Sequence, residues 1–262
     1  MPAPEPRRLL ILGGTAEAAA LAREAAAAFG DRVEIITALA GRTREPAALP
    51  GTVRSGGFGG AKGLADYLAA EGIAMVVDAT HPFATAISDH ARTACDKAAV
   101  PRLVLARPPW RKQRGDRWIE VDDVAGAAAE LRRLGGRALV TVGVKELDAF
   151  AGLGGVFCLV RLIEPPAKPL RLADYEVITG RGPFTVAGER RLLAGHRIDV
   201  VVSKASGGGA TRAKITAARE LGLPVIMVRR PAAPPGERVS RVPAALGWIA
   251  ERLYGTCRPI SN

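Results

Sequence analysis

Polar residues stand directly after two apolar segments of this 262-residue chain. Asp78–His81 follow the apolar run Ile73–Val77, and Gly13–Thr15 follow Leu9–Leu12. Each apolar run predicts a buried strand, and ligands of open parallel sheets bind at the carboxyl ends of the strands. We therefore expect both polar segments at one binding edge. His81 is the candidate protonatable group there, with a structural role as the alternative.

The glycines of two segments indicate a dinucleotide. Gly13, Gly14 and Thr15 lie between a predicted strand and a predicted helix, where bare backbone and a helix N-terminus favour a pyrophosphate. The spacing lacks the third glycine of GxGxxG, so a plain strand-to-helix turn stays open. Ser55–Gly60 (SGGFGG), which includes Gly57, follows another predicted strand. It indicates either a cofactor-side loop or a mobile loop.

The segment after the second predicted strand favours NADPH over NADH. NAD sites usually carry an acid here, whereas NADP sites carry arginine for the 2′-phosphate. This chain has no acid at that place and offers Arg42, Thr43 and Arg44. Solvated loop arginines are the alternative.

A set of basic residues follows the predicted strands of the C-terminal half. The segment Val202–Thr211 precedes a helix whose first turn carries Arg212 and Lys214. Cations at a helix N-terminus oppose the helix dipole, and a bound anion reverses that cost. Three further strand ends also carry basic residues: Lys145, Arg161 and Arg181. Each alone is typical of a surface charge, but together they suit a ligand with several carboxylates.

The composition favours a small anionic ligand. Lysine and arginine number 37 against 26 acids, a net charge of +11, and thirty of the 37 are arginines. Guanidinium groups bind carboxylates and phosphates in bidentate fashion, although a general bias toward Arg and Ala is the alternative explanation. Nucleic acid is disfavoured, because the arginines are scattered and aromatic residues make up only 5% of the chain.

Several classes of protein are disfavoured by what the sequence lacks. No apolar run reaches the ~18 residues that span a bilayer, and the three cysteines lack disulfide or metal spacing. GxSxG and HExxH are missing, and no tyrosine is followed by lysine four residues later. We expect a soluble, cytoplasmic protein without a membrane-spanning segment or metal site.

Alternating strand and helix patterns predict an α/β fold with parallel sheets. The apolar runs are continuous, which is typical of strands covered on both faces. Strands are predicted at 8–12, 32–38, 52–54, 73–79, 102–106, 118–121, 138–142, 156–160, 176–179, 199–203, 224–228 and 238–242. Helices are predicted at 16–28, 61–71, 84–98, 124–134, 184–194, 211–221 and 244–253.

We predict two Rossmann-like domains, residues 1–116 and 117–262, with an interdomain cleft. The boundary is soft, because the short strands at 118–121 and 238–242 suit either sheet.

The chain resembles the precorrin-6A reductase family over nearly its whole length, in the family's order of motifs. The similar segments are Ile11–Ala18, Leu39–Thr43, Ser55–Gly60, Asp78–Ala84, Arg107–Trp110, Gly182–Phe184, Ser203–Gly208 and Arg229–Pro231. The pair DATHPFA and SGGFGG is the most specific part.

The resemblance implies an NADPH-dependent reductase of cobalamin biosynthesis. Its substrate would be precorrin-6A or the cobalt complex, a tetrapyrrole with many carboxylates, and the product the 6B form. NADPH would be held in the first domain by Gly13, Gly14, Thr15, Arg42, Thr43, Gly57 and Thr80. Substrate would be bound by Arg107 and by a set of polar and basic residues of the second domain: Lys145, Arg161, Arg181, Ser203, Lys204, Ser206 and Arg212. A proton would come from His81 or from solvent.

Other functions remain open from the sequence. One is a non-catalytic sensor that binds NADPH or a tetrapyrrole, and another is a reductase or epimerase of a different small polyanion. The Ser203–Thr211 loop could hold the dinucleotide instead of the first domain. Neighbouring pathway enzymes are conceivable partners.

Overall fold

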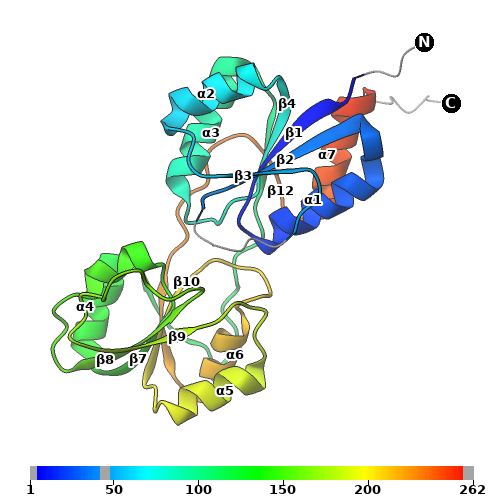
Figure 1. Ribbon diagram of the computed structural model, residues 1–262. Coiled ribbons are helices and arrows are strands. Elements are labelled where there is room, and N and C mark those ends of the chain that lie inside the picture. Colours follow the sequence, from blue (N-terminus) through cyan, green and yellow to red (C-terminus); the bar gives the residue numbers. More distant parts are fainter. Residues whose placement is uncertain (1–4, 42–47, 256–262) are drawn as a thin grey trace. The chain divides into compact units, whose positions relative to one another are not determined.

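The chain divides into two units, which we describe separately. In the computed structural model the residues described are 5–41 and 48–255. The first unit comprises residues 1–107 and 231–262, and the second comprises residues 108–230. Each is built on its own six-stranded sheet (Figure 1).

The first unit is a parallel sheet covered by helices on both faces. The strands, in the order β12-β5-β4-β1-β2-β3, are β1 (Arg7–Leu12), β2 (Val33–Leu39), β3 (Thr52–Ser55), β4 (Ile73–Asp78), β5 (Arg102–Leu105) and β12 (Glu237–Val239). Helices α1 (Ala16–Phe29) and α7 (Val242–Tyr254) cover one face, and α2 (Gly60–Ala70) and α3 (Thr85–Ala98) cover the other (Figure 1).

The packing of the core explains why the strands are continuous apolar runs in the sequence. Leu9 and Ile11 of β1 pack toward α1 and α7, whereas Leu10 and Leu12 pack toward α2 and α3. All four are at most 2% exposed. A strand buried on both faces needs apolar residues at every position, so the parallel, doubly covered sheet predicted from the sequence is confirmed.

The second unit repeats this architecture. Its strands, in the order β6-β11-β10-β7-β8-β9, are β6 (Arg117–Val121), β7 (Gly136–Val140), β8 (Val156–Leu162), β9 (Asp174–Thr179), β10 (Val200–Lys204) and β11 (Pro224–Val228). Helices α5 (Val186–Gly195) and α6 (Ala213–Glu220) pack on one face and α4 (Val124–Leu134) on the other (Figure 1). The short helices η1 (Gly30–Arg32) and η2 (Val144–Phe150), which the sequence did not predict, complete the elements.

The C-terminal segment differs from the predicted division at residue 116. Strand β12 pairs in parallel with β5 of the first sheet, and α7 buries Ala245, Trp248 and Ile249 in the core that α1 shares. The chain therefore crosses between the units twice, at residues 107–108 and 230–231. The physical reason is that the apolar face of α7 packs in one core with Met75 and Val77 of β4 and with Leu103 and Leu105 of β5.

Within residues 5–41 and 48–255, none of the helices combines the length and the apolar character needed to cross a membrane.

Candidate functional site

The loop after β1 exposes backbone at the carboxyl edge of the first sheet. The Gly13 amide donates to Ala38 O at 2.9 Å, and a Cβ at Gly13 would lie 3.1 Å from the Thr37 methyl group. Gly13 thus allows two strands to approach closely. Gly14 has a φ of +100° and no atom within 4 Å of an ideal Cβ. The residue with bare backbone available to a ligand is therefore Gly14 rather than Gly13.

Thr15 fixes the start of α1. Its hydroxyl accepts from the Ala18 amide at 3.1 Å and donates to Ala79 O, past the end of β4, at 2.7 Å. This is an N-cap, and it leaves the first amides of a 14-residue helix without intrahelical acceptors. The Thr15 side chain positions the helix terminus, while the amides offer the place for an anion.

Arg107 lies with the first unit, against the acid in the first turn of α1. Its Nη1 is 2.8 Å from Glu17 Oε2, and the two side chains are only 15% and 26% exposed. A free Glu17 carboxylate would repel a phosphate at the helix N-terminus. The ion pair with Arg107 offsets that charge. The contact of Arg107 with substrate carboxylates stays a prediction.

The SGGFGG loop is held by an arginine that the sequence analysis did not single out. Arg54, near the end of β3, donates to Gly56 O at 2.8 Å and to Gly57 O at 2.9 Å. Its guanidinium carbon lies 4.0 Å from the centre of the Phe58 ring. The Gly56 amide also donates to Leu39 O, which joins this loop to the end of β2. A Cβ at Gly57 would meet no atom within 4 Å, so its backbone faces open space.

Hydrogen bonds connect the polar segment after β4 to the helix that follows it. Asp78 is 2% exposed, and its Oδ1 accepts from the Thr80 amide at 3.1 Å and the Thr80 hydroxyl at 2.7 Å. The Thr80 hydroxyl is also 3.2 Å from Ser88 Oγ of α3. Asp78 and Thr80 therefore hold the strand end to the following helix.

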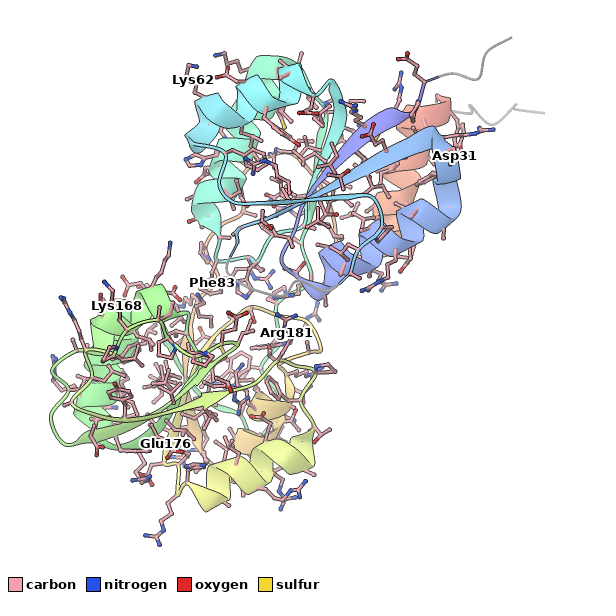
Figure 2. All side chains as sticks on the ribbon, viewed as in Figure 1. Asp31, Lys62, Phe83, Lys168, Glu176 and Arg181 are labelled. Carbon is pink, nitrogen blue, oxygen red and sulfur yellow. The ribbon has the colours of Figure 1, made fainter. Side chains whose placement is uncertain are left out.

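His81, the next residue after Thr80, is half-buried. Its Nδ1 accepts from the Phe83 amide at 3.3 Å, which favours the neutral tautomer with the proton on Nε2. Figure 2 places Phe83 on the loop ahead of α3. The predicted residues Arg42 and Thr43 lie outside the described part of the chain.

The first unit has the features that a dinucleotide requires. The glycine backbones at Gly14, Gly56 and Gly57 and the N-terminus of α1 all belong to loops that follow strands of one parallel sheet. Backbone amides and a helix N-terminus are the groups that bind a pyrophosphate. The residues present therefore fit a dinucleotide.

In the second unit, two of the predicted cations are paired with acids. Arg161 of β8 donates from both terminal nitrogens to Glu189 of α5, at 2.7 and 2.9 Å. The two side chains are 8% and 3% exposed. Lys204 Nζ is 2.6 Å from Glu146 Oε2, with a 14% exposed lysine side chain. Both cations are fixed in place by these acids.

The other predicted residues of this unit divide into exposed and buried. Lys145, Arg181 and Arg212 are exposed, and Figure 2 shows Arg181 on the loop between β9 and α5. Ser203 is 1% exposed and Ser206 is 6% exposed. The exposed cations are the ones that can contact a ligand without rearrangement.

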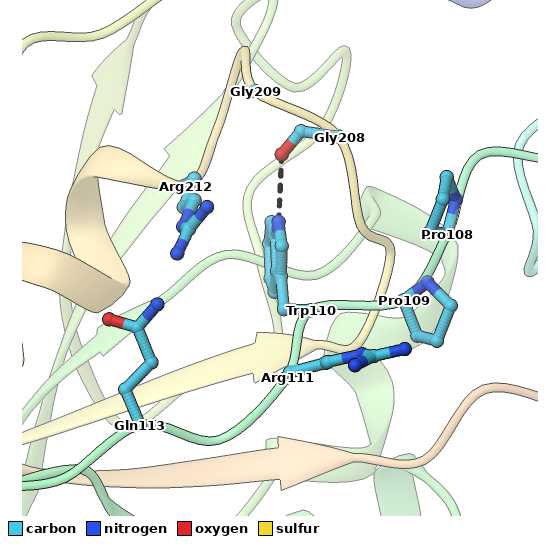
Figure 3. Close-up of a pocket in the computed structure, with 8 residues that line it drawn as sticks. All are labelled: Pro108, Pro109, Trp110, Arg111, Gln113, Gly208, Gly209 and Arg212. Carbon is cyan, nitrogen blue, oxygen red and sulfur yellow. Dashed lines mark hydrogen bonds between the residues drawn. The ribbon is translucent and has the colours of Figure 1, made fainter. Parts of the chain in front are cut away.

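A pocket of about 430 Å³ opens in the second unit. The residues that line it are Pro108, Pro109, Trp110, Arg111, Gln113, Gly208, Gly209 and Arg212 (Figure 3). The indole nitrogen of Trp110 donates to Gly208 O at 2.7 Å, joining the 108–113 segment to the loop before α6 (Figure 3).

Lys214 and two cysteines are the side chains whose acidity burial changes most clearly. Lys214 is 6% exposed, and burial, assisted by the neighbouring Arg161 charge and opposed by Glu189, lowers its pKa to about 8. Burial raises the pKa of Cys95 to about 12 and of Cys158 to about 11. Both thiols are therefore protonated near neutral pH and unsuited to act as nucleophiles.

Comparison with known proteins identifies the family. The profile described as precorrin-6x reductase CbiJ/CobK matches residues 8–250. The precorrin-6A reductase of Rhodococcus erythropolis is 48% identical over 243 residues, which cover 92% of this chain and 97% of the relative. The chain belongs to the precorrin-6x reductase family. The resemblance found in the sequence motifs is thereby confirmed.

Other members agree with this assignment. The precorrin-6A reductase of Rhodobacter capsulatus is 43% identical over 244 residues, covering 93% of this chain and 96% of the relative. A solved structure of CobK precorrin-6A reductase matches with a TM-score of 0.88 and 43% identity, over 94% of this chain and 97% of that chain. Members of the precorrin-6x reductase family are oxidoreductases, so the predicted enzyme class is confirmed. The two parallel sheets and the match to the CobK structure confirm the two predicted Rossmann-like units.

Sequence reasoning missed the groups that act through long-range contacts. Glu17, Glu146 and Glu189 were not singled out, although each pairs with a predicted cation. Lys214 was noticed only as a charge in a first helical turn. A lysine within an otherwise buried stretch of Ala and Ile is the signal that could have found it.

Proposed function

We propose that this protein reduces a ring double bond of precorrin-6A, or of its cobalt complex, with NADPH. The observation that carries the proposal is the open glycine backbone beside the capped N-terminus of α1, in a chain of the precorrin-6x reductase family. The curated relatives are named precorrin-6A reductase or cobalt-precorrin-6A reductase.

The first unit would hold NADPH. The amides at Gly14 and Thr15 would bind the pyrophosphate, and the Gly57 backbone would lie against the cofactor. Arg42 and Thr43 would bind the 2′-phosphate, which gives NADPH its preference over NADH. When bound, NADPH supplies the hydride. Gly13, Thr15 and Thr80 support the site by holding strand ends and α1 together.

The second unit would bind the carboxylates of the tetrapyrrole. The exposed Lys145, Arg181 and Arg212 are the proposed direct contacts. Arg161 and Lys204 would contact carboxylates as ion pairs whose positions are fixed by Glu189 and Glu146. The remaining predicted residues, Arg107, Ser203 and Ser206, are proposed to position these groups rather than to contact the substrate.

The proton that completes the reduction would come from His81 or from solvent. The hydrogen bond from the Phe83 amide leaves His81 Nδ1 unprotonated. His81 would therefore donate from Nε2 only as the imidazolium, after Nδ1 has taken up a proton and released that hydrogen bond.

Turnover and binding assays with the intact protein test the proposal. We expect precorrin-6A to accelerate the loss of NADPH absorbance and NADH to be a poor substitute. Arg42→Ala should weaken NADPH binding by about tenfold or more, the scale of a lost charge-assisted hydrogen bond, with NADH binding unchanged. Tight binding of both ligands without turnover would instead identify a sensor. Unchanged NADPH affinity would remove Arg42 from the site.

A further inference from the structure

The pocket of the second unit is lined by cations without a matching acid. Its lining contains Arg111, Arg212 and Gln113 but no carboxylate side chain. Among residues 5–41 and 48–255, neither Arg111 nor Arg212 forms an ion pair. Figure 3 shows Arg212 across from the indole of Trp110 and the Arg111 side chain extending from the other side toward Pro109. The hydrogen bond to Gly208 O holds the indole in place. The lining therefore offers positive charge around a fixed aromatic wall.

A buried lysine adjoins this wall. Lys214 is 6% exposed and lies in the first turn of α6, two residues after Arg212. Its Nζ is 5.6 Å from the centre of the Trp110 ring. In the part of the chain that the structure describes, this ammonium has no hydrogen bond and no ion pair.

The charges around Lys214 do not cancel. Arg161 and Glu189 are the ionised neighbours whose charges act on it, and those two groups are already joined by two hydrogen bonds. The cluster of Lys214, Arg161 and Glu189 thus carries one excess positive charge. Burying an unpaired charge is unfavourable, and the positive end of the α6 dipole adds to the cost. An anion in the adjoining pocket would offset both terms.

We propose that this pocket is a carboxylate subsite for the substrate, with Arg111 and Arg212 as direct contacts and Lys214 as the buried cation that strengthens it. The inference rests on the proposed function for the identity of the substrate. The volume of about 430 Å³ lies toward the lower end of the roughly 300–1,000 Å³ of small-molecule sites. It suits a carboxylate arm and the adjoining edge of a macrocycle, with the Trp110 ring against the apolar part.

Titration with uroporphyrin, a stable tetrapyrrole polycarboxylate, tests the subsite in the full chain. The proteins are the wild type, Lys214→Met, Arg212→Met and the control Lys168→Met, which removes an exposed lysine of the same unit. We expect Arg212→Met to bind the probe about tenfold or more weakly, as for a lost charged hydrogen bond. Lys214→Met should weaken binding by about tenfold, because it removes a buried charge next to the subsite. The control should stay within about twofold, and NADPH affinity should be unchanged in all three.

Two results would overturn the subsite. One is probe affinity within about twofold of wild type in Lys214→Met and Arg212→Met, and the other is an equal loss in Lys168→Met, which would indicate general charge attraction. If Lys214→Met does not fold, Arg212→Met, an exposed position, decides alone. Turnover of precorrin-6A by the wild type is measured separately. Absence of turnover would refute the proposed function, and the probe titration would still test whether the pocket binds carboxylates. With turnover present, Lys214→Met should raise KM and leave kcat near the wild-type value.

Discussion

Replacement of Lys214 by methionine should make the second unit more stable near neutral pH. Methionine keeps most of the length and volume of the buried lysine chain and removes its charge. Burial and the Arg161 charge oppose that charge, and Glu189 compensates for it only in part. Such a stabilisation is expected when the replaced residue contributes to ligand binding but lowers the stability of the fold.

The size and the pH dependence of the effect follow from the pKa of Lys214. Folding lowers this pKa from 10.5 to about 8, and each unit is worth about 1.4 kcal/mol. The charged lysine thus destabilises the fold by roughly 3 kcal/mol. Its contact with the Trp110 ring reduces this cost to about 2 kcal/mol. Between pH 8 and 10.5 the unfolded chain keeps the proton that the folded chain has released. Wild-type stability therefore rises with pH relative to Lys214→Met.

Urea unfolding monitored by tryptophan fluorescence measures this difference. Trp110 and Trp118 report on the second unit, and Trp248→Phe in both proteins removes the signal of the first unit. The advantage of Lys214→Met should be about 2–3 kcal/mol at pH 7 and should shrink steadily above pH 8. A difference that stays constant up to pH 10.5, or a variant less stable than wild type at pH 7, would refute the reasoning.

Two further substitutions test particular contacts. Glu189→Gln leaves Arg161 buried without its acid and should destabilise the second unit by about 3–5 kcal/mol in the same urea assay; a loss below about 1 kcal/mol would contradict a buried pair. Gly63→Ala places a Cβ on the carbonyl oxygen of Phe58, so the SGGFGG loop must shift and NADPH affinity should fall about tenfold, or ~1.4 kcal/mol. Gly247→Ala, where an added Cβ meets no atom within 4 Å, is its control and should bind NADPH normally.

The order and type of the elements could be predicted because their signals are local. The run Leu9–Leu12 is apolar at every position, and its alternate residues fill the cores on the two faces of one sheet. Thr15 caps α1 by accepting from the amide of Ala18, only three residues later in the chain. The polar break at Asp78–His81 after a buried run is likewise visible in the sequence itself, and it marks the carboxyl end of β4.

The ion-pair partners of individual cations could not be predicted in this way. Arg161, Lys204 and Arg107 are predicted to bind substrate, and the acids that pair with them lie 28, 58 and 90 residues away in the chain. No periodicity or spacing encodes which acid folds against which base. The same holds for Lys214, whose burial depends on the packing of Trp110 and α6.

The sequence by itself determined the two parallel sheets, the glycine loops at their carboxyl ends and the family, because short-range hydrophobic patterns and motifs carry that information. The tertiary structure alone decided that β12 and α7 complete the first sheet, and that one lysine of α6 is buried without an ion-pair partner among the described residues. Which side chains pair across long sequence separations depends on their positions in space, and those positions are fixed only in the folded chain.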